Sequence, residues 1–104
     1  MAEHRVRRTL AADHPCLAGH FPGQPVVPAV LLLEWVAEAV LAQLRESDKD
    51  YVMEGIPEAK FLRPLMPEQP ADIFWQETAE AIVFRCEREG SLIARGRLKL
   101  VPAR

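Results

Sequence analysis

The chain has 104 residues, a length typical of a single domain, and we expect one domain over residues 1–104. Hydrophobic residues make up 49% of it and charged residues 27%, which excludes a disordered tail, a low-complexity linker and a coiled-coil rod. Thirteen Lys and Arg against fifteen Asp and Glu give a net charge of -2. This balance lacks the overall basic charge that nucleic-acid binding favours.

No segment of the sequence predicts export or membrane insertion. The longest wholly apolar run, residues 29–33, is far shorter than the roughly 20 residues that a membrane span needs. Residues 1–8 are charged and no long apolar stretch follows them, so we expect no signal peptide. Two cysteines, Cys16 and Cys86, are too few for a disulfide framework. We therefore expect a cytoplasmic protein with both thiols free, and Cys86 to serve in packing.

The N-terminal part predicts an edge strand followed by a long connection. Residues 3–11 alternate loosely, with Val6 and Leu10 among charged residues. Residues 13–28 hold four prolines and two glycines, which predict a stiff and irregular segment. Connections of this length in compact domains are usually functional when they are not disordered. The apolar residues within the segment favour the functional interpretation.

A long helix is predicted from Pro28 to about Glu46. Proline suits the first helical position, and the alanines and leucines that follow are strong helix formers. Between residues 29 and 41 only Glu34 and Glu38 are polar. The helix is therefore expected to be buried nearly all round.

The rest of the chain predicts antiparallel strands. Residues 51–54 and 59–62 flank a break at residues 55–57, and two further strands are expected over 72–78 and 81–88. A final strand over 91–101 follows the hairpin signal Glu89-Gly90. Its core face is predicted to carry the alternate residues Leu92, Ala94, Gly96, Leu98 and Leu100. One buried helix followed by such strands predicts an α+β fold with the sheet wrapped over the helix.

Two residues stand out as candidates for acid–base chemistry. Glu34 lies in the second turn of the apolar helix, and a carboxyl buried without a cationic partner shifts toward the neutral form that a general acid needs. The residue alone leaves open that Glu34 faces water or an interface. His20 lies in the proline-rich connection, and imidazole is the commonest general base near neutral pH. The spacing permits the two side chains to meet without requiring it.

Residues 19–36, GHFPGQPVVPAVLLLEWV, closely resemble the active-site signature of the β-hydroxyacyl-acyl carrier protein dehydratases. A second stretch, residues 59–67, resembles the strand and turn Phe-x-x-Pro-x-x-Pro of the same family. Residues 12–15 and Trp35 are most similar to the short stand-alone members of secondary pathways, such as aryl polyene assembly. The signature positions matched in type and spacing are His20, Phe21, Pro22, Pro25, Pro28, Val30 and Glu34.

The resemblance implies a hot-dog fold, in which a curved antiparallel sheet wraps around one long central helix. It also implies a dimer in which His20 of one protomer faces Glu34 of the other. His20 would remove the α-proton of a 3-hydroxyacyl thioester, and Glu34 would protonate the departing hydroxyl, giving a trans-2-enoyl thioester. The N–H of Ala29 and the helix dipole would stabilise the thioester oxygen. This is acid–base chemistry, so no metal or other cofactor is expected.

The substrate is expected to be a thioester of acyl carrier protein or of coenzyme A. Two residues depart from the family pattern: Ala29 replaces a glycine at the carbonyl-binding N–H, and Glu38 stands where a glutamine commonly supports the site. Either change would alter substrate size or rate without removing the acid or the base. The residues implied to line the acyl tunnel are Phe21, Val30, Leu33 and Phe61.

Two other functions stay open at the level of sequence. One is a hot-dog thioesterase, in which Glu34 would activate water. The other is a non-catalytic acyl-binding subunit that forms a heterodimer with a different hot-dog chain. The basic residues Arg63, Arg95, Arg97 and Lys99 are interpreted first as a solvated strand face, and second as a docking rim for an acidic carrier protein. Acyl-chain length and pathway are not determined by these residues.

Overall fold

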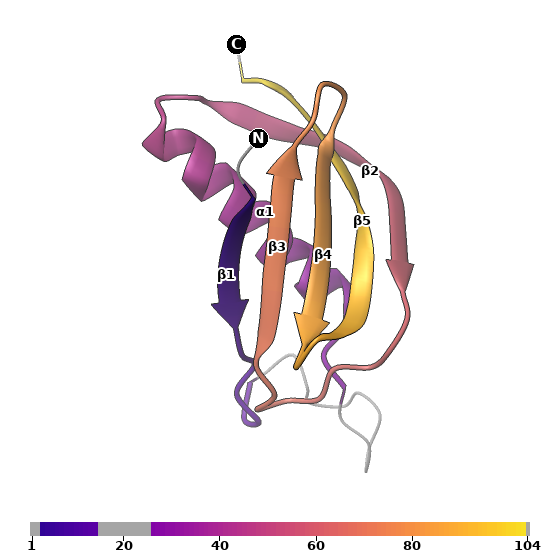
Figure 1. Ribbon diagram of the computed structural model, residues 1–104. Helices are drawn as coiled ribbons and strands as arrows, with labels where there is room; N and C mark the ends of the chain where they lie inside the picture. The colour runs from indigo at the N-terminus through magenta and orange to yellow at the C-terminus, as the bar shows by residue number, and fades with distance from the viewer. Residues whose placement is uncertain (1–2, 15–25, 104) are drawn as a thin grey trace.

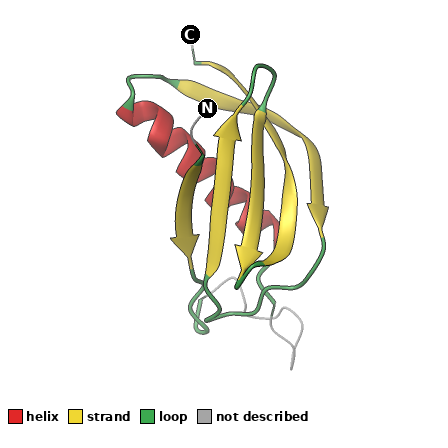
Figure 2. Cartoon of the chain, viewed as in Figure 1, coloured by secondary structure: helices red, strands yellow, loops and turns green. Residues whose placement is uncertain are grey.

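The computed structural model describes residues 3–14 and 26–103, which form one helix and five strands (Figure 1). Neighbouring strands pair antiparallel in the order β1-β3-β4-β5-β2. The helix crosses one face of this curved sheet (Figure 2). The predicted α+β architecture is confirmed. The elements in chain order are β1 (His4–Arg8), α1 (Ala29–Glu46), β2 (Tyr51–Phe61), β3 (Ala71–Glu77), β4 (Ile82–Arg88) and β5 (Ser91–Pro102).

Helix α1 ends at Glu46 as the sequence predicts and begins at Ala29, one residue later than predicted. Pro28 is the N-cap, with extended backbone, and its carbonyl accepts the N–H of Leu31 at 3.0 Å. At the other end Asp48 adopts a left-handed φ of 59°. The N–H of Asp48 donates to the carbonyl of Arg45 at 3.0 Å, and the N–H of Lys49 to that of Leu44 at 2.9 Å. These two bonds form a Schellman motif, which satisfies the last carbonyls and ends the helix.

The expectation that α1 is buried nearly all round is wrong for the single chain. The sheet covers one side of the helix only, because one layer of strands can contact only one face of a cylinder. On the other side Val30 is 64% exposed, and Glu34 and Glu38 are exposed as well. The residues buried against the sheet are Leu32, Trp35, Val36, Ala39, Val40 and Leu44.

No helix in the described part of the chain is long and apolar enough to cross a membrane.

Strand β2 runs through the predicted break at residues 55–57. Its pairing with β5 shifts register between Met53 and Gly55 and again between Gly55 and Glu58. These irregularities place Pro57, which has no N–H to donate, in a stretch without regular pairing. Strand β2 is also an edge of the sheet and has only β5 as a neighbour. The missing N–H of Pro57 therefore does not leave a carbonyl of another strand without its hydrogen bond. The strand therefore continues where the sequence predicts two.

The β4–β5 hairpin forms as predicted, and a bulge follows it. Glu89 and Gly90 have φ angles of 51° and 81°, as a two-residue type I′ turn requires. Further along, Glu87 pairs with Leu92 but Cys86 pairs with Ala94, so one residue of β5 lies between the two pairs. That residue, Ile93, is 3% exposed, whereas Leu92 is only half-buried. The predicted alternation is thus corrected at Leu92 and holds from Ala94 onward.

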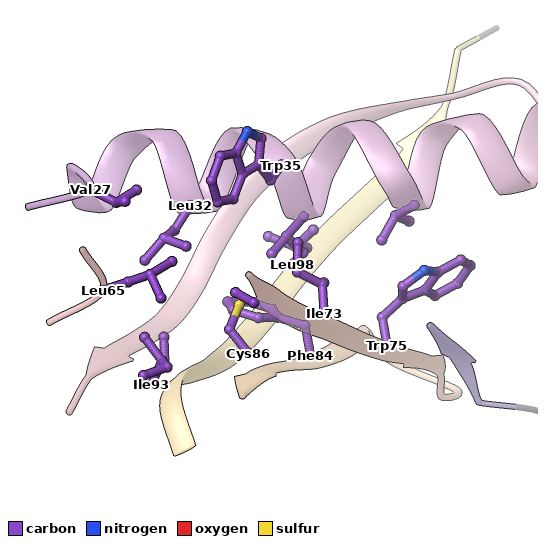
Figure 3. Close-up of a cluster of buried hydrophobic side chains, with 14 of the residues drawn as sticks. Val27, Leu32, Trp35, Leu65, Ile73, Trp75, Phe84, Cys86, Ile93 and Leu98 are labelled. Carbon is purple, nitrogen blue, oxygen red and sulfur yellow. The ribbon is translucent and has the colours of Figure 1, made fainter. Parts of the chain in front are cut away.

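The core lies between α1 and the concave face of the sheet (Figure 3). Trp75, Ile73 and Leu98 are among its largest fully buried side chains. Cys86 is fully buried there, and this burial raises the pKa of its thiol to about 12. A thiol that stays protonated at neutral pH is a poor nucleophile, so the prediction that Cys86 serves in packing is confirmed.

Candidate active site

An open groove of about 260 Å³ lies at the start of α1. One wall is formed by Val26, Val27 and Ala29 at the entry to the helix. The other is formed by Phe61 at the end of β2 and by residues 62–65 that follow it. The N–H of Val27 donates to the carbonyl of Leu65 at 2.7 Å and joins the two walls. The groove therefore brings together Ala29 and Phe61, two of the predicted substrate-binding residues.

The bulge in β5 positions the second wall. Ile93 lies outside the β4–β5 register, and its carbonyl accepts the N–H of Leu62 at 2.8 Å and of Arg63 at 3.3 Å. Leu65 is 1% exposed and anchors the segment in the core near Leu32, as Figure 3 shows. Phe61 and Leu62 remain 42% and 46% exposed. The apolar side chains of Phe61 and Leu62 therefore face solvent in the groove, although hydrogen bonds to Ile93 fix the backbone of this segment.

The start of α1 offers backbone N–H groups and a partial positive charge to this groove. The described residues place no side-chain cap on the helix and no acidic residue in its first turn. The positive end of the helix dipole is therefore not neutralised by a carboxylate of the first turn. Ala29 lies at the groove and is exposed. Its position suits a role in holding a developing oxyanion, and its Cβ occupies space that a glycine would leave open.

Glu34 lies on the side of α1 that the sheet leaves uncovered. Val30, Glu34 and Glu38 are four residues apart, so they form one stripe along the helix. All three are exposed, and Leu33 beside them is half-buried. The sequence left open whether Glu34 is buried among apolar side chains or faces water or an interface. In the single chain the Glu34 side chain is exposed, so the first interpretation does not hold there. We call the exposed and half-buried residues of this side the uncovered stripe: Val30, Leu33, Glu34, Ala37, Glu38 and Leu41.

The predicted base lies outside the described residues. His20 and the tunnel residue Phe21 both belong to residues 15–25, and so does Cys16. The distance between His20 and Glu34 is therefore not among the contacts of this structure, and their pairing stays a prediction.

The predicted basic residues divide into two groups. Arg97 Nε lies 3.4 Å from Glu58 Oε1, and Arg95 Nη1 lies 3.8 Å from Glu58 Oε2. Lys99 is paired in the same way with an acidic residue of β2. These cations belong to ion pairs across the exposed outer face of β2 and β5, which favours the interpretation as a solvated strand face. Arg63 stands apart from them, because it lines the groove at the start of α1.

Residues 1–97 match the model of the ApeI-like family, which is described as the ApeI dehydratase. The chain belongs to the ApeI-like dehydratase family. It is 36% identical over 75 residues to the 3-hydroxyacyl-[acyl-carrier-protein] dehydratase FabZ of Mannheimia succiniciproducens, which covers 67% of this chain and 50% of that protein. It is 41% identical over 66 residues to FabZ of Haemophilus influenzae, covering 58% and 44%. The chain spans about half the length of these curated relatives.

Solved structures show the same fold. The dehydratase heterocomplex ApeI:P from Xenorhabdus doucetiae superposes with a TM-score of 0.80 at 25% identity, covering 94% of this chain and 86% of that one. An acyl-CoA hydrolase from Staphylococcus aureus superposes with a TM-score of 0.68 at 14% identity, covering 96% and 62%. The second likeness concerns the fold alone. The hot-dog fold and the resemblance to the dehydratases inferred from the sequence are confirmed.

The sequence prediction missed most of the second wall of the groove. It included Phe61 among the substrate-binding residues but not Leu62, Pro64 or Leu65, which line the same space. The signal was present, since these residues lie within the Phe-x-x-Pro-x-x-Pro motif of residues 59–67. What the motif does not reveal is that this turn packs against the entry to α1.

Proposed function

We propose that this chain dehydrates 3-hydroxyacyl thioesters of acyl carrier protein to trans-2-enoyl thioesters, as one hot-dog domain over residues 1–104. The observation that carries the proposal is the membership of residues 1–97 in a dehydratase family. Two features of the geometry support it. Ala29 lies at an apolar groove at the positive end of α1, and Glu34 stands on the exposed side of the same helix. A cytoplasmic location stays a prediction.

In the proposed reaction His20 takes the α-proton of the substrate. The electron pair of the broken C–H bond forms the double bond, while Glu34 gives a proton to the β-hydroxyl, which leaves as water. Negative charge develops on the thioester oxygen as the α-proton leaves. The N–H of Ala29 and the helix dipole stabilise that charge, and no acidic side chain of the first helical turn opposes them.

The proposal requires a second chain over the uncovered stripe, because Glu34 is exposed in one chain alone. A partner packed there would remove water from the carboxyl and favour its neutral, proton-donating form. Strand β2 supports such an arrangement, since it is an edge of the sheet and its Val52 and Met53 are 48% and 40% exposed. An apolar sheet edge is a common surface for association. We propose a homodimer in which His20 of one protomer faces Glu34 of its partner.

The likeness to the ApeI:P heterocomplex favours a second candidate, in which this chain is one subunit of a heterodimer with another hot-dog chain. The uncovered stripe would then be covered by a chain of different sequence. Native mass spectrometry of the chain alone and mixed with a second hot-dog chain from the same organism separates the two arrangements. A stable homodimer that turns over substrate supports the first candidate, and a monomer active only with a partner supports the second.

The test of the activity follows water loss from a 3-hydroxyacyl carrier-protein thioester by mass spectrometry. General acid–base catalysis contributes about 10²–10⁴-fold, so His20→Ala and Glu34→Gln should each lower kcat by roughly that factor. Glu46→Gln, at the far end of α1, is the matched control and should leave the rate unchanged. Release of the free carboxylic acid would identify a thioesterase instead. Full rates in both variants would contradict the assigned roles.

A further inference from the structure

A second groove, of about 430 Å³, adjoins the candidate active site. The two grooves share Arg63 and Pro64 as lining residues. The first is lined mainly by aliphatic side chains, whereas the second also contains Arg88, Gln69 and Ser91. An elongated ligand that is apolar at one end and anionic at the other would fit the two adjoining grooves, with its apolar end in the first and its anionic end in the second. We call the second one the Arg63–Arg88 groove.

The hydrogen-bonding groups of the Arg63–Arg88 groove are mostly donors. Arg88 lines the groove, and its Nη1 donates to Glu89 Oε1 at 2.7 Å, which holds the guanidinium. Gln69 Oε1 accepts the N–H of Met66 at 3.0 Å, so the amide nitrogen is left to donate elsewhere. Two guanidiniums face a single carboxylate, that of Glu89, which leaves one positive charge for an anion.

Arg63 differs from the other basic residues that the sequence singled out. It forms no ion pair with another described residue, whereas Arg95 and Arg97 both pair with Glu58. Its backbone is nevertheless held, because its N–H donates to the carbonyl of Ile93. A cation that is placed by its backbone but not neutralised by a carboxylate is available to a ligand.

We propose that the Arg63–Arg88 groove binds the phosphate of the phosphopantetheine arm that carries the acyl thioester. This inference rests on the proposed function, because it takes the thioester to lie near Ala29 and the arm to pass over Arg63 and Pro64. Guanidinium groups suit phosphate oxygens, since they offer several donors in a rigid fork. Of the predicted rim residues Arg63, Arg95, Arg97 and Lys99, this proposal keeps Arg63 and adds Arg88.

The first experiment measures binding without turnover. Calorimetry compares 4′-phosphopantetheine with pantetheine, which lacks the phosphate, on the full chain in its native assembly. We expect the phosphate to tighten Kd about tenfold or more, as charge-assisted hydrogen bonds allow. Arg63→Gln and Arg88→Gln should each remove most of this difference. Arg5→Gln, on the outer face of the sheet where Asp72 also pairs with Arg7, should retain it. Equal Kd values for the two probes would overturn the proposal.

Circular dichroism and the urea midpoint of each variant, compared with the native chain, check that it is folded. Arg88→Lys provides a second check, because an ammonium retains the charge but not the fork, so part of the difference between the probes should survive. A difference that survives fully in both glutamine variants would also overturn the proposal.

The second experiment identifies the source of the phosphate and separates this proposal from the proposed function. Thioesters of acyl carrier protein and of coenzyme A share the 4′-phosphate, so both should show a raised KM in the glutamine variants with kcat nearly unchanged. The thioester with the lower KM in the native protein is the source. Phosphate-dependent binding without dehydration of either thioester would refute the proposed function alone. Dehydration with the same KM in native protein and variants would refute the phosphate site alone.

Discussion

The two sides of α1 have similar apolar sequences and opposite surroundings. On the covered side Val36 and Val40 are completely buried against the sheet. On the other side Val30 is 64% exposed, and the only polar residues of the first three turns, Glu34 and Glu38, stand beside it. The number of apolar residues therefore does not distinguish the side of α1 that packs against the sheet from the side that is available to a partner. The positions of Glu34 and Glu38 distinguish them, because both carboxylates lie on the uncovered side.

The largest expected effect concerns the covered side. Leu32 is 4% exposed and contributes to the core, so Leu32→Ala should lower the free energy of unfolding by about 2–5 kcal/mol. Urea unfolding followed by circular dichroism measures this change. A loss below about 1 kcal/mol would mean that the covered side is loosely packed.

A smaller loss is expected at Gly96, where β2 pairs with β5. A Cβ built on Gly96 would overlap the carbonyl oxygen of Glu58 and lie 2.8 Å from the Phe84 ring. Gly96→Ala must therefore displace backbone or a buried ring, at a cost of about 1–3 kcal/mol in the free energy of unfolding. The same denaturation assay tests it, and Gly55→Ala, where nothing lies within 4 Å of the added Cβ, is the matched control.

The uncovered side should respond differently. Val30→Asp is expected to change the free energy of unfolding of the separated chain by no more than about 0.5 kcal/mol, because the side chain is mostly exposed. In the proposed dimer the same carboxylate would be buried without a partner and would weaken association. Sedimentation at several protein concentrations measures the association. A dimer of unchanged stability would place the interface elsewhere.

The smallest effect lies on the outer face of the sheet, away from both sides of the helix. Arg7 and then Arg5 hydrogen-bond the Asp72 carboxylate and hold its pKa below the usual value. A lowered folded-state pKa contributes stability above the unfolded pKa of about 3.9, and this stability is lost as the pH falls through the folded value. Asp72→Asn should therefore reduce the loss of stability below about pH 4. Urea midpoints at neutral and acidic pH, compared with the native chain, test this sign.

Local signals account for the elements that were predicted well. Pro28 sets the start of α1, and Glu89-Gly90 adopts the two positive φ angles of a tight hairpin. The bounds of β3, β4 and β5 follow from the alternation of apolar and polar residues along each strand and from the turn residues that flank it. The interruption predicted at Pro57 is the instructive error, because an edge position and two register shifts permit a strand where the local sequence argues against one.

The amino-acid sequence by itself determined the helix, the hairpin, the antiparallel strands and the dehydratase family, because each depends on residues near one another or on a contiguous motif. Only the tertiary structure decided which side of α1 is covered, that Glu58 pairs with Arg95 and Arg97, and that the turn after β2 meets the entry to α1 through the Val27–Leu65 hydrogen bond. The three named contacts join residues 37 to 39 positions apart. The pairing of such distant segments is set by packing and register rather than by local spacing. The partnership of His20 with Glu34 is of the same kind and stays a prediction.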